Sequence, residues 1–337
     1  MKPFKTDVAV LMLFFTRTNI TKHTFAQICK ARPSKLFLYQ DGPRKGRKDD
    51  VEKIQECRNM VESMIDWNCE IHRFYQEKNF GCDPSEYLSQ KWMFSFVDRG
   101  IIIEDDDVMS ESFFPFCKEL LDKYADDKRI YMICGQNILG EYNAGGKDYF
   151  FCNRGAIWGW ATWKRSIDSW DPDYKFIENT YSVKCLEALH KKRFWSNFVK
   201  TCKKHKFTGR EHYESIGYSS QLVNSQLNII PAKNMTCNIG IASESTHSVS
   251  KITRLDRSIR KVFFQKTYEY SFPLNHPEYV IEDYDYESKI NKILKGNFFV
   301  RLFKLRQIER VLYIFFPFLG EIGSQCEKRR AEKFANN

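Results

Sequence analysis

The sequence lacks the marks of several protein classes. Its 11 cysteines include no C-x-x-C pair, which argues against a zinc or disulfide framework and favours reduced cysteines in a cytosolic protein. No window reaches the roughly 18 apolar residues of a membrane span. The short apolar run 8–15 has no small-residue cleavage site and continues into Arg17, so we expect neither an export signal nor an anchor.

Negative charge is scarce in two late segments. The 337 residues carry 53 Lys or Arg against 43 Asp or Glu, a net charge of +10. Residues 184–210 contain nine basic residues and one acid, and residues 295–333 contain nine and four, so the remainder has a net charge of −3. The basic excess therefore belongs to two segments, and its partner could be nucleic acid, anionic lipid or a phosphorylated substrate.

Short apolar runs alternate with helical patterns through about the first 135 residues. The pattern predicts strands at residues 7–14, 35–40, 70–75, 100–103 and 130–134, with helices at 21–31, 49–65, 85–97 and 110–124. Strands that are apolar throughout are typical of a sheet buried on both faces. We therefore expect an α/β fold, a mixed and mostly parallel sheet with helices on both faces.

Four consecutive acids, Glu104 to Asp107, follow the apolar strand at 100–103. Carboxylates this close repel one another unless a cation lies among them. The carboxyl end of a strand is also where ligands bind in open α/β sheets. Mg²⁺ and Mn²⁺ prefer oxygen ligands and share them with substrate phosphates. The run predicts a metal site with a nucleotide diphosphate, and an acidic capping turn is the alternative.

Two further residues follow predicted strands. Asp41 comes directly after the strand at 35–40, where it could accept hydrogen bonds from a nucleobase or ribose, or form an Asx turn before Gly42. Arg17 lies just past the first strand and could contact a base or diphosphate, or simply be a solvated loop cation.

Three segments together resemble bacterial glycosyltransferases of the GT-A fold, which are related to glycosyltransferase family 2. They are NFGCDPSEYLSQKWMFSFVDRGIIIEDDDVMSESFFPFC, IWGWATWKRSIDSWD and NMTCNIGIASESTHS. Their order and spacing are also similar to those of N-acetylglucosaminyltransferase I. The resemblance covers roughly residues 7–250. It implies a GT-A (Rossmann-like, nucleotide-diphospho-sugar transferase) catalytic domain over 1–250, with a nucleotide-sugar half to about 135 and an acceptor half over about 136–250. Residues 251–337 would form a basic, aromatic helical extension.

The resemblance implies inverting transfer from a nucleotide sugar, and roles for individual residues. Asp106 would carry Mn²⁺ or Mg²⁺ and take part in catalysis, with Asp105 or Asp107 as alternative ligands. The residues assigned to the nucleotide sugar are Arg17, Asp41, Glu104, Asp105, Ser245 and His247.

An inverting transferase needs a carboxylate that accepts the proton of the acceptor hydroxyl. Many of the similar proteins have a W-D-Y-Q-type segment before the N-I-G strand, where this chain has His212-Tyr213-Glu214-Ser215. We therefore nominate Glu214 as the general base, with Asp168 and Asp171 as competitors.

Aromatic residues are concentrated in the block Ile157–Trp163. Trp158, Trp160 and Trp163 could stack on acceptor sugar faces as the wall of a site, or they could be core residues. The sequence leaves both interpretations open.

The segment 297–316 alternates apolar residues with Arg301, Lys304, Arg306 and Arg310. It could lie on an anionic membrane or pack on the catalytic domain. We expect a glycosyltransferase of lipopolysaccharide, capsule or another surface glycan, with a glycan or lipid-linked acceptor. It would be cytoplasmic, with peripheral attachment at the inner face of the cytoplasmic membrane as an open alternative.

Two other function classes remain as alternatives. A sugar nucleotidyltransferase would need a glycine-rich phosphate loop, and the turn TRTNIT after Phe15 has no glycine. A non-catalytic membrane or nucleic-acid binder gives no reason for carboxylates at a strand end, which oppose phosphate binding without a metal. We expect no nucleic-acid partner.

Overall fold

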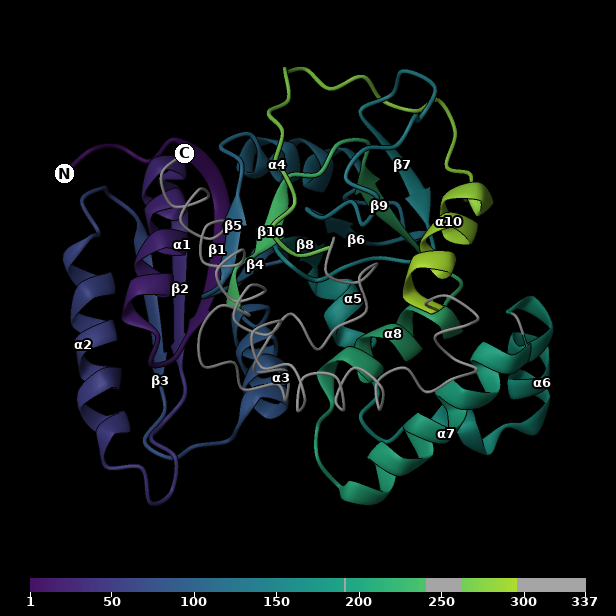
Figure 1. Cartoon of the computed structure of the whole chain (residues 1–337), viewed down its shortest axis with the longest axis horizontal. Helices are drawn as coiled ribbons and strands as arrows, with labels where there is room; N and C mark the ends of the chain where they lie inside the picture. The colour runs from purple at the N-terminus through teal and green to yellow at the C-terminus, as the bar shows by residue number, and fades with distance from the viewer. Residues whose placement is uncertain (191, 241–261, 296–337) are drawn as a thin grey trace, which may run out of the picture. The chain divides into compact units, whose positions relative to one another are not determined.

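The computed structural model describes residues 1–190, 192–240 and 262–295, which divide into two compact units (Figure 1). Unit 1 comprises Met1–Asp105, Phe114–Ile133 and Trp160–Ile229. Unit 2 comprises Asp106–Phe113, Cys134–Gly159 and the described residues from Ile230 onward. The chain passes from one unit to the other inside the acidic run, directly after Asp105.

Unit 1 opens with the alternation of strands and helices that the sequence predicts. Its first elements are β1 (Thr6–Phe14), α1 (Thr18–Ala31), β2 (Pro33–Gln40), α2 (Asp49–Ser63), β3 (Glu70–Tyr75), α3 (Cys82–Met93) and β4 (Arg99–Glu104). Helix α3 begins three residues before the predicted start. Gly81 precedes it with φ +83°, a backbone conformation that glycine adopts without steric cost.

The sheet is mixed and mostly parallel. β1 pairs in parallel with β2 and β4, and β2 pairs in parallel with β3. β8 (Trp160–Trp163) runs antiparallel to β4, whereas β6 (Ile130–Cys134) and β9 (Leu227–Pro231) are parallel. The eight strands follow the order β3-β2-β1-β4-β8-β6-β9-β7, in which β7 is Tyr149–Cys152. The predicted α/β fold class is confirmed.

The central strands are buried on both faces, as their unbroken apolar sequences predict. Leu11 and Met12 of β1 and Ile101 and Ile103 of β4 are all 0% exposed. Each fully buried side chain of this size contributes about 1.5–3 kcal/mol relative to an exposed one. These two strands therefore form a rigid base for the residues that follow them.

The connections of the sheet reverse direction between β1 and β4. The chain goes outward from β1 to β2 and β3 through α1 and α2, then returns through α3 to β4 on the other side of β1. Because such crossovers are right-handed, α3 covers the face opposite to α1 and α2. The carboxyl ends of β1 and β4 thus form a topological switch point, where open α/β sheets bind ligands.

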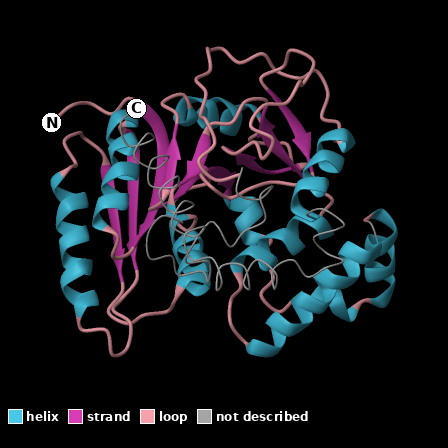
Figure 2. Cartoon of the chain, in the orientation of Figure 1, coloured by secondary structure: helices cyan, strands magenta, loops and turns pink. Residues whose placement is uncertain are grey.

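The rest of unit 1 is mostly helical (Figure 2). Its helices are α4 (Phe113–Lys123, from Phe114 onward), α5 (Lys164–Asp168), the 3-10 helix η1 (Lys175–Glu178), α6 (Thr180–Leu189), α7 (Lys192–Thr208) and α8 (Tyr213–Val223). α6 and α7 together contain most of the basic segment 184–210. The sequence pattern does not predict α8, whose interior contains Gly217 and several serines of low helix propensity. It is stabilised by packing on α3, α5 and α7.

Unit 2 contains a short antiparallel pair, β5 (Asp107–Met109) with β10 (Thr236–Asn238), and the helix α10 (Tyr284–Lys295), which packs on β7. β9 and β10 are separate strands, because the buried Asn234 side chain accepts the N–H of Asn137 at 3.0 Å and the chain turns there.

Among the described residues, no helix is both long enough and apolar enough to cross a bilayer. The cysteines of this part of the chain are free thiols, and most are buried. Burial raises the pKa of the Cys57 and Cys202 thiols to about 12. These thiols are therefore protonated core groups at neutral pH.

Candidate functional site

An ion pair joins the ends of β1 and β4 at the switch point. Arg17 Nε donates to Asp105 Oδ2 at 3.3 Å, and Arg17 Nη2 donates to Asp105 Oδ1. The hydroxyls of two α1 residues add bonds, Thr21 to the Asp105 carboxylate at 3.5 Å and Thr24 to the Asp105 carbonyl at 2.9 Å. The fold thus brings together Arg17 and Asp105, two residues that the family resemblance assigns to nucleotide-sugar binding.

This ion pair is largely withdrawn from water. The side chain of Asp105 is 7% exposed and that of Arg17 is 21% exposed. A guanidinium that forks onto a carboxylate forms strong and directional hydrogen bonds, whereas a buried carboxylate without a partner is costly. Asp105 therefore anchors Arg17, and Arg17 is the member of the pair that an anionic ligand could reach.

Asp41 holds the loop at residues 79–81. Its carboxylate accepts the backbone N–H groups of Gly42, Phe80 and Gly81, each at 2.9 Å, and the side-chain amide of Asn79 at 2.8 Å. Burial raises the pKa of Asp41, while these backbone donors lower it. Asp41 is 7% exposed, and four donors occupy most of the acceptor capacity of a carboxylate. These bonds give Asp41 a role in positioning this loop, and its predicted contact with the nucleotide stays a prediction.

The charges of Glu104 and Glu214 both raise the pKa of the same two buried groups of unit 1. Glu214 is exposed in the first turn of α8, directly after the buried Tyr213. Burial raises the pKa of the Tyr213 hydroxyl, and the charges of Glu104, Glu86 and Glu214 raise it further. Burial also raises the pKa of the Cys82 thiol, with Glu86, Glu104 and Glu214 adding to it. The charges at the end of β4 and at the start of α8 thus both affect these two buried groups, and we call Arg17, Glu104, Asp105 and Glu214 the strand-end site.

Asp106 and Asp107 belong to unit 2. Asp107 is 0% exposed, and its Oδ2 accepts the N–H of Gly159 at 2.8 Å. Asp106 is 8% exposed, and its Oδ1 accepts a hydrogen bond from Asn238 Nδ2 at 2.7 Å. Gly159 has φ +62°, a backbone conformation that suits glycine. Asp107 thus secures the Trp-Gly-Trp turn, and Asn238 orients Asp106.

A divalent cation fits this arrangement if the substrate supplies further oxygen ligands. The described part of the chain holds no group of three or more His, Cys, Asp or Glu that could hold a metal ion. Asp105 is bonded to Arg17, Asp107 to the Gly159 backbone and Asp106 to the Asn238 side chain, so each of the three predicted carboxylates has a protein partner. Mg²⁺ is commonly held by one or two carboxylates together with substrate phosphates. The residues present therefore suit a cation that arrives with a nucleotide diphosphate.

The tryptophan block is divided between core and surface. Trp160 and Trp163 are each 3% exposed, and Trp163 Nε1 donates to the Leu121 carbonyl at 3.1 Å. Side chains this buried cannot contact a soluble acceptor, so we remove both from the predicted acceptor wall. Trp158 is partly exposed in unit 2, with its ring centroid 4.6 Å from that of Phe263. Trp158 stays the candidate for this role.

The two competitors of Glu214 have structural roles. Asp168 forms an ion pair with Lys164 on the exposed side of α5. The Asp171 carboxylate accepts the backbone N–H groups of Asp173 at 3.1 Å and Lys175 at 2.6 Å, which caps η1. Neither pattern suggests a general base.

Ser245, His247 and the segment 297–316 lie outside the described residues. Their predicted contacts with the diphosphate and with an anionic membrane stay predictions.

Sequence reasoning missed two asparagines, Asn79 and Asn238, each of which orients an aspartate of a motif. Asn79 is 38 positions from Asp41, and Asn238 is 132 positions from Asp106. An asparagine has no such role until the fold brings its partner to it. The one available signal is that both lie inside segments that carry the family resemblance.

No family model matches the sequence, and a comparison with curated proteins finds no match. Among solved structures, the chain is similar to a UDP-glucose pyrophosphorylase complexed with UDP-glucose, at 10% identity and a TM-score of 0.29, over 48% of this chain and 78% of that one. It is similar to the glycosyltransferase GlyE of Streptococcus pneumoniae, at 12% identity and a TM-score of 0.31, over 67% of this chain and 45% of that one. It is also similar to the inositol-1-phosphate CTP transferase from T. maritima, at 8% identity and a TM-score of 0.35, over 77% of this chain and 96% of that one. Similarities this low assign no activity to this chain, which spans less than half of GlyE.

Proposed function

We propose that the chain is an inverting, divalent-metal-dependent glycosyltransferase of GT-A type that uses a nucleotide-diphosphate sugar. The observation that carries this proposal is the strand-end site. Arg17 is held by a buried carboxylate at the switch point of the sheet. The exposed carboxylate of Glu214 directly follows Tyr213, a buried residue whose pKa is raised by the charges of both Glu104 and Glu214. Asp106 is the next residue of the chain after Asp105.

Donor binding would rely on Arg17 and Asp106. Arg17 would contact the donor diphosphate, because it is the more exposed member of its ion pair. Asp106, oriented by Asn238, would hold Mn²⁺ or Mg²⁺. Such a cation, when bound, would supply stabilisation of the negative charge on the leaving diphosphate. Asp105 would lie toward the ribose or sugar of the donor, and Glu104 would also take part in binding the nucleotide sugar.

Transfer would use Glu214 as the general base. The Glu214 carboxylate would accept the proton of an acceptor hydroxyl as its oxygen forms a bond to the anomeric carbon of the donor sugar. The bond from that carbon to the diphosphate oxygen breaks, and the nucleoside diphosphate leaves from the opposite face. A positioned base of this kind typically contributes about 10²–10⁴-fold to the rate.

The product distinguishes this proposal from a sugar nucleotidyltransferase. Nucleotidyl transfer breaks a bond at the α-phosphorus and releases pyrophosphate, whereas sugar transfer releases a nucleoside diphosphate. The chain has no glycine between Phe15 and Gly42, so it has no glycine-rich phosphate loop after β1. This feature favours sugar transfer.

The test is a thermal-shift screen of UDP-, GDP- and TDP-sugars with Mn²⁺ present, followed by product identification. A ligand at 100 times its Kd stabilises the folded state by about 2.7 kcal/mol. We expect one nucleotide sugar to stabilise the chain and a nucleoside diphosphate to be released. Stabilisation by none of them, or release of pyrophosphate, would contradict the proposal.

We infer that the acceptor is a glycan or lipid-linked precursor of lipopolysaccharide or capsule at the inner face of the cytoplasmic membrane. Lys200, Lys203 and Lys204 of α7 are exposed, which supports an anionic surface as a partner. Co-sedimentation with vesicles of anionic lipid, and not with vesicles of neutral lipid, would be the expected result.

A further inference from the structure

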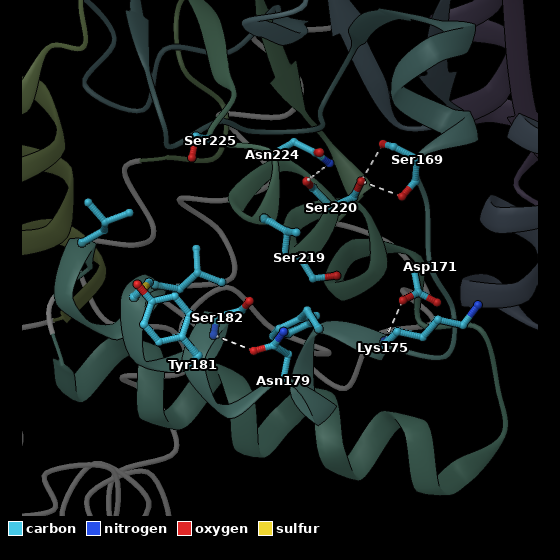
Figure 3. A pocket seen from close by; sticks show the side chains of 15 residues that line it. Ser169, Asp171, Lys175, Asn179, Tyr181, Ser182, Ser219, Ser220, Asn224 and Ser225 are labelled. Atoms are coloured by element: carbon cyan, nitrogen blue, oxygen red, sulfur yellow. Dashed lines mark hydrogen bonds between the residues drawn. The ribbon is translucent and has the colours of Figure 1, made fainter.

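A pocket of about 620 Å³ lies between α6 and α8 in unit 1 (Figure 3). Residues of η1 and Ser169, after α5, also line it. Its volume falls within the range of about 300–1,000 Å³ that small-molecule sites occupy. No residue of the strand-end site lines it, and we call it the α6–α8 pocket.

The pocket is open because α6 and α8 pack mainly on other elements. α6 packs on η1 and α7, whereas α8 packs on α3, α5 and α7. Leu186 of α6 belongs both to the pocket lining and to a buried cluster with Trp195 and Leu222. One wall of the pocket is therefore fixed to the core, and the pocket is part of the folded structure.

One part of the lining consists of hydroxyl and amide groups that are held in place. Ser220 Oγ lies 2.6 Å from Ser169 Oγ and donates to the Ser169 carbonyl at 2.9 Å. Asn224 Nδ2 donates to the Ser220 carbonyl at 2.8 Å. On the facing helix, Asn179 Oδ1 accepts the N–H of Ser182 at 2.9 Å. Figure 3 shows these groups on two sides of the pocket.

These side chains have further hydrogen-bonding capacity. A side-chain amide has two donors and one acceptor, and a hydroxyl has one donor and two acceptor lone pairs. Among the described residues, the bonds named above use one donor of Asn224 and the oxygen of Asn179. The Asn224 oxygen and the Asn179 donors thus suit a ligand that both donates and accepts hydrogen bonds, as sugar hydroxyls do.

Another part of the lining is apolar and exposed. Tyr181 is 75% exposed, Leu189 is 63% exposed and Val223 is 44% exposed. A single exposed apolar side chain is ordinary, but several that line one polar pocket need a reason. An aromatic ring beside fixed polar groups matches the two kinds of surface on a sugar, its C–H face and its hydroxyl edge.

The pocket carries no excess charge of one sign. Its charged lining residues are Asp171 and Lys175. The Asp171 carboxylate is engaged by the backbone N–H groups of Asp173 and Lys175. A phosphate or nucleotide would find one lysine and one carboxylate here, whereas sites for such anions use several cations or free N–H groups.

We propose that the α6–α8 pocket binds a neutral saccharide, separately from the strand-end site. Tyr181 stacks on the C–H face of a sugar ring, and Asn179 and Asn224 bind its hydroxyl groups. If the proposed function holds, the pocket retains part of a glycan acceptor away from the reacting hydroxyl. The binding itself does not depend on transfer activity.

The test begins with the full-length chain, without nucleotide or metal, on an array of neutral and anionic glycans. The best neutral hit is then titrated by calorimetry into wild type and variants. Tyr181→Ala is expected to weaken binding at least ten-fold and Tyr181→Phe to retain it, because the ring supplies the contact. Tyr279→Ala is the matched control, since Tyr279 is 65% exposed and lies in unit 2.

Three results would overturn the inference: no neutral glycan binds, only anionic glycans bind, or Tyr181→Ala binds as tightly as wild type. Circular dichroism of Tyr181→Ala confirms its fold, and Asn224→Ala gives a second, independent loss of binding. Failure of this inference is distinguishable from failure of the proposed function. Glycan binding without nucleoside diphosphate release would support the saccharide pocket and contradict the proposed transfer activity. Nucleoside diphosphate release without glycan binding would support the transfer activity and contradict the saccharide pocket.

Discussion

The two ends of α8 serve two regions of unit 1 that are built from opposite kinds of side chain. Glu214, in the first turn, belongs to the strand-end site, and Asn224, at the C-terminal cap, lines the α6–α8 pocket. The 11 residues of α8 at 1.5 Å each span about 16 Å. One rigid helix therefore connects a group of ionised side chains with a cavity whose lining carries no excess charge of one sign.

Substitutions in the two regions should affect different properties of the protein. In the strand-end site, Asp105 is buried and depends on Arg17, because an unpaired carboxylate in the interior is expensive. In the α6–α8 pocket, the main apolar groups are exposed, and the polar groups bond to nearby serines and backbone. Substitutions at the strand-end site should therefore affect folding and catalysis, whereas those in the pocket should affect binding alone.

The largest effect is expected from Asp106→Asn. Sugar transfer should fall by about 10³-fold, because loss of metal stabilisation of the leaving diphosphate costs several kcal/mol. Glycan binding by the α6–α8 pocket should not change. Initial rates of nucleoside diphosphate release and calorimetry with the glycan measure the two quantities. The control is Asp126→Asn, at an exposed position of unit 1. Equal loss of both functions would mean that the regions are not separate.

The next-largest effect concerns the contribution of the Arg17–Asp105 ion pair to the stability of the protein. Arg17→Met leaves the buried Asp105 carboxylate unpaired and should lower the free energy of unfolding by about 3 kcal/mol. The double variant Arg17→Met/Asp105→Asn should recover part of this loss, because the uncompensated charge is removed. Urea unfolding curves give both values. If the two substitutions are simply additive, the coupling inferred between these residues is wrong.

A third effect concerns the proposed base. Glu214→Gln should reduce the transfer rate by about 100-fold or more and remove the acid limb of the pH–rate profile. Donor binding in the thermal-shift assay and glycan binding in the pocket should stay as in wild type. Glu211→Gln, three residues earlier in the chain, is the matched control. An unchanged turnover in Glu214→Gln would exclude Glu214 as the base.

The smallest effect should arise at His205 of α7, which contacts residues at the start of α8. Its Nδ1 lies 2.7 Å from Ser215 Oγ, which also bonds to the Tyr174 hydroxyl at 2.6 Å, and its ring stacks on His212. Burial, followed by the charge of His212, lowers the pKa of His205 below 6.5. A lowered pKa means that the folded state favours the neutral ring. This contribution to stability is present above pH 6.5 and is lost as the pH falls from there toward the folded-state pKa.

The free energy of unfolding should therefore decrease as the pH falls below about 6.5 toward the folded-state pKa of His205, and the decrease should be smaller in His205→Gln. His23→Gln is the control, because His23 is exposed on α1. A decrease of the same size in His205→Gln would show that other groups cause it.

The sequence alone predicted the strands and helices of the first half closely, since β3 and β6 coincide with their predicted ranges. Apolar strands and acid-rich helix starts are local signals, and local chemistry decides them. The sequence pattern did not predict α8, because its serines and Gly217 disfavour a helix. The stability of α8 comes from packing on α3, α5 and α7.

The candidate site was predictable in type but not in its contacts. The acidic run after a buried strand indicated where chemistry could occur, and the structure places Asp105 and Arg17 together there. No local pattern shows that Asp41 is saturated by the 79–81 loop or that Trp160 and Trp163 are core residues. Exposure and bonding partners depend on distant segments, which a sequence window does not contain.

By itself, the sequence determined the α/β alternation, the uneven distribution of charge and the position of four acids after an apolar strand. Only the tertiary structure decided the partner of each acid. Asp105 is paired with Arg17, Asp107 is bonded to Gly159, and Asp106 is oriented by Asn238. The tertiary structure also created the α6–α8 pocket from residues 169–225, which no local pattern marks as the lining of one cavity. The physical reason is that hydrophobic periodicity is encoded locally, whereas burial and hydrogen bonding are set by the residues that folding brings together.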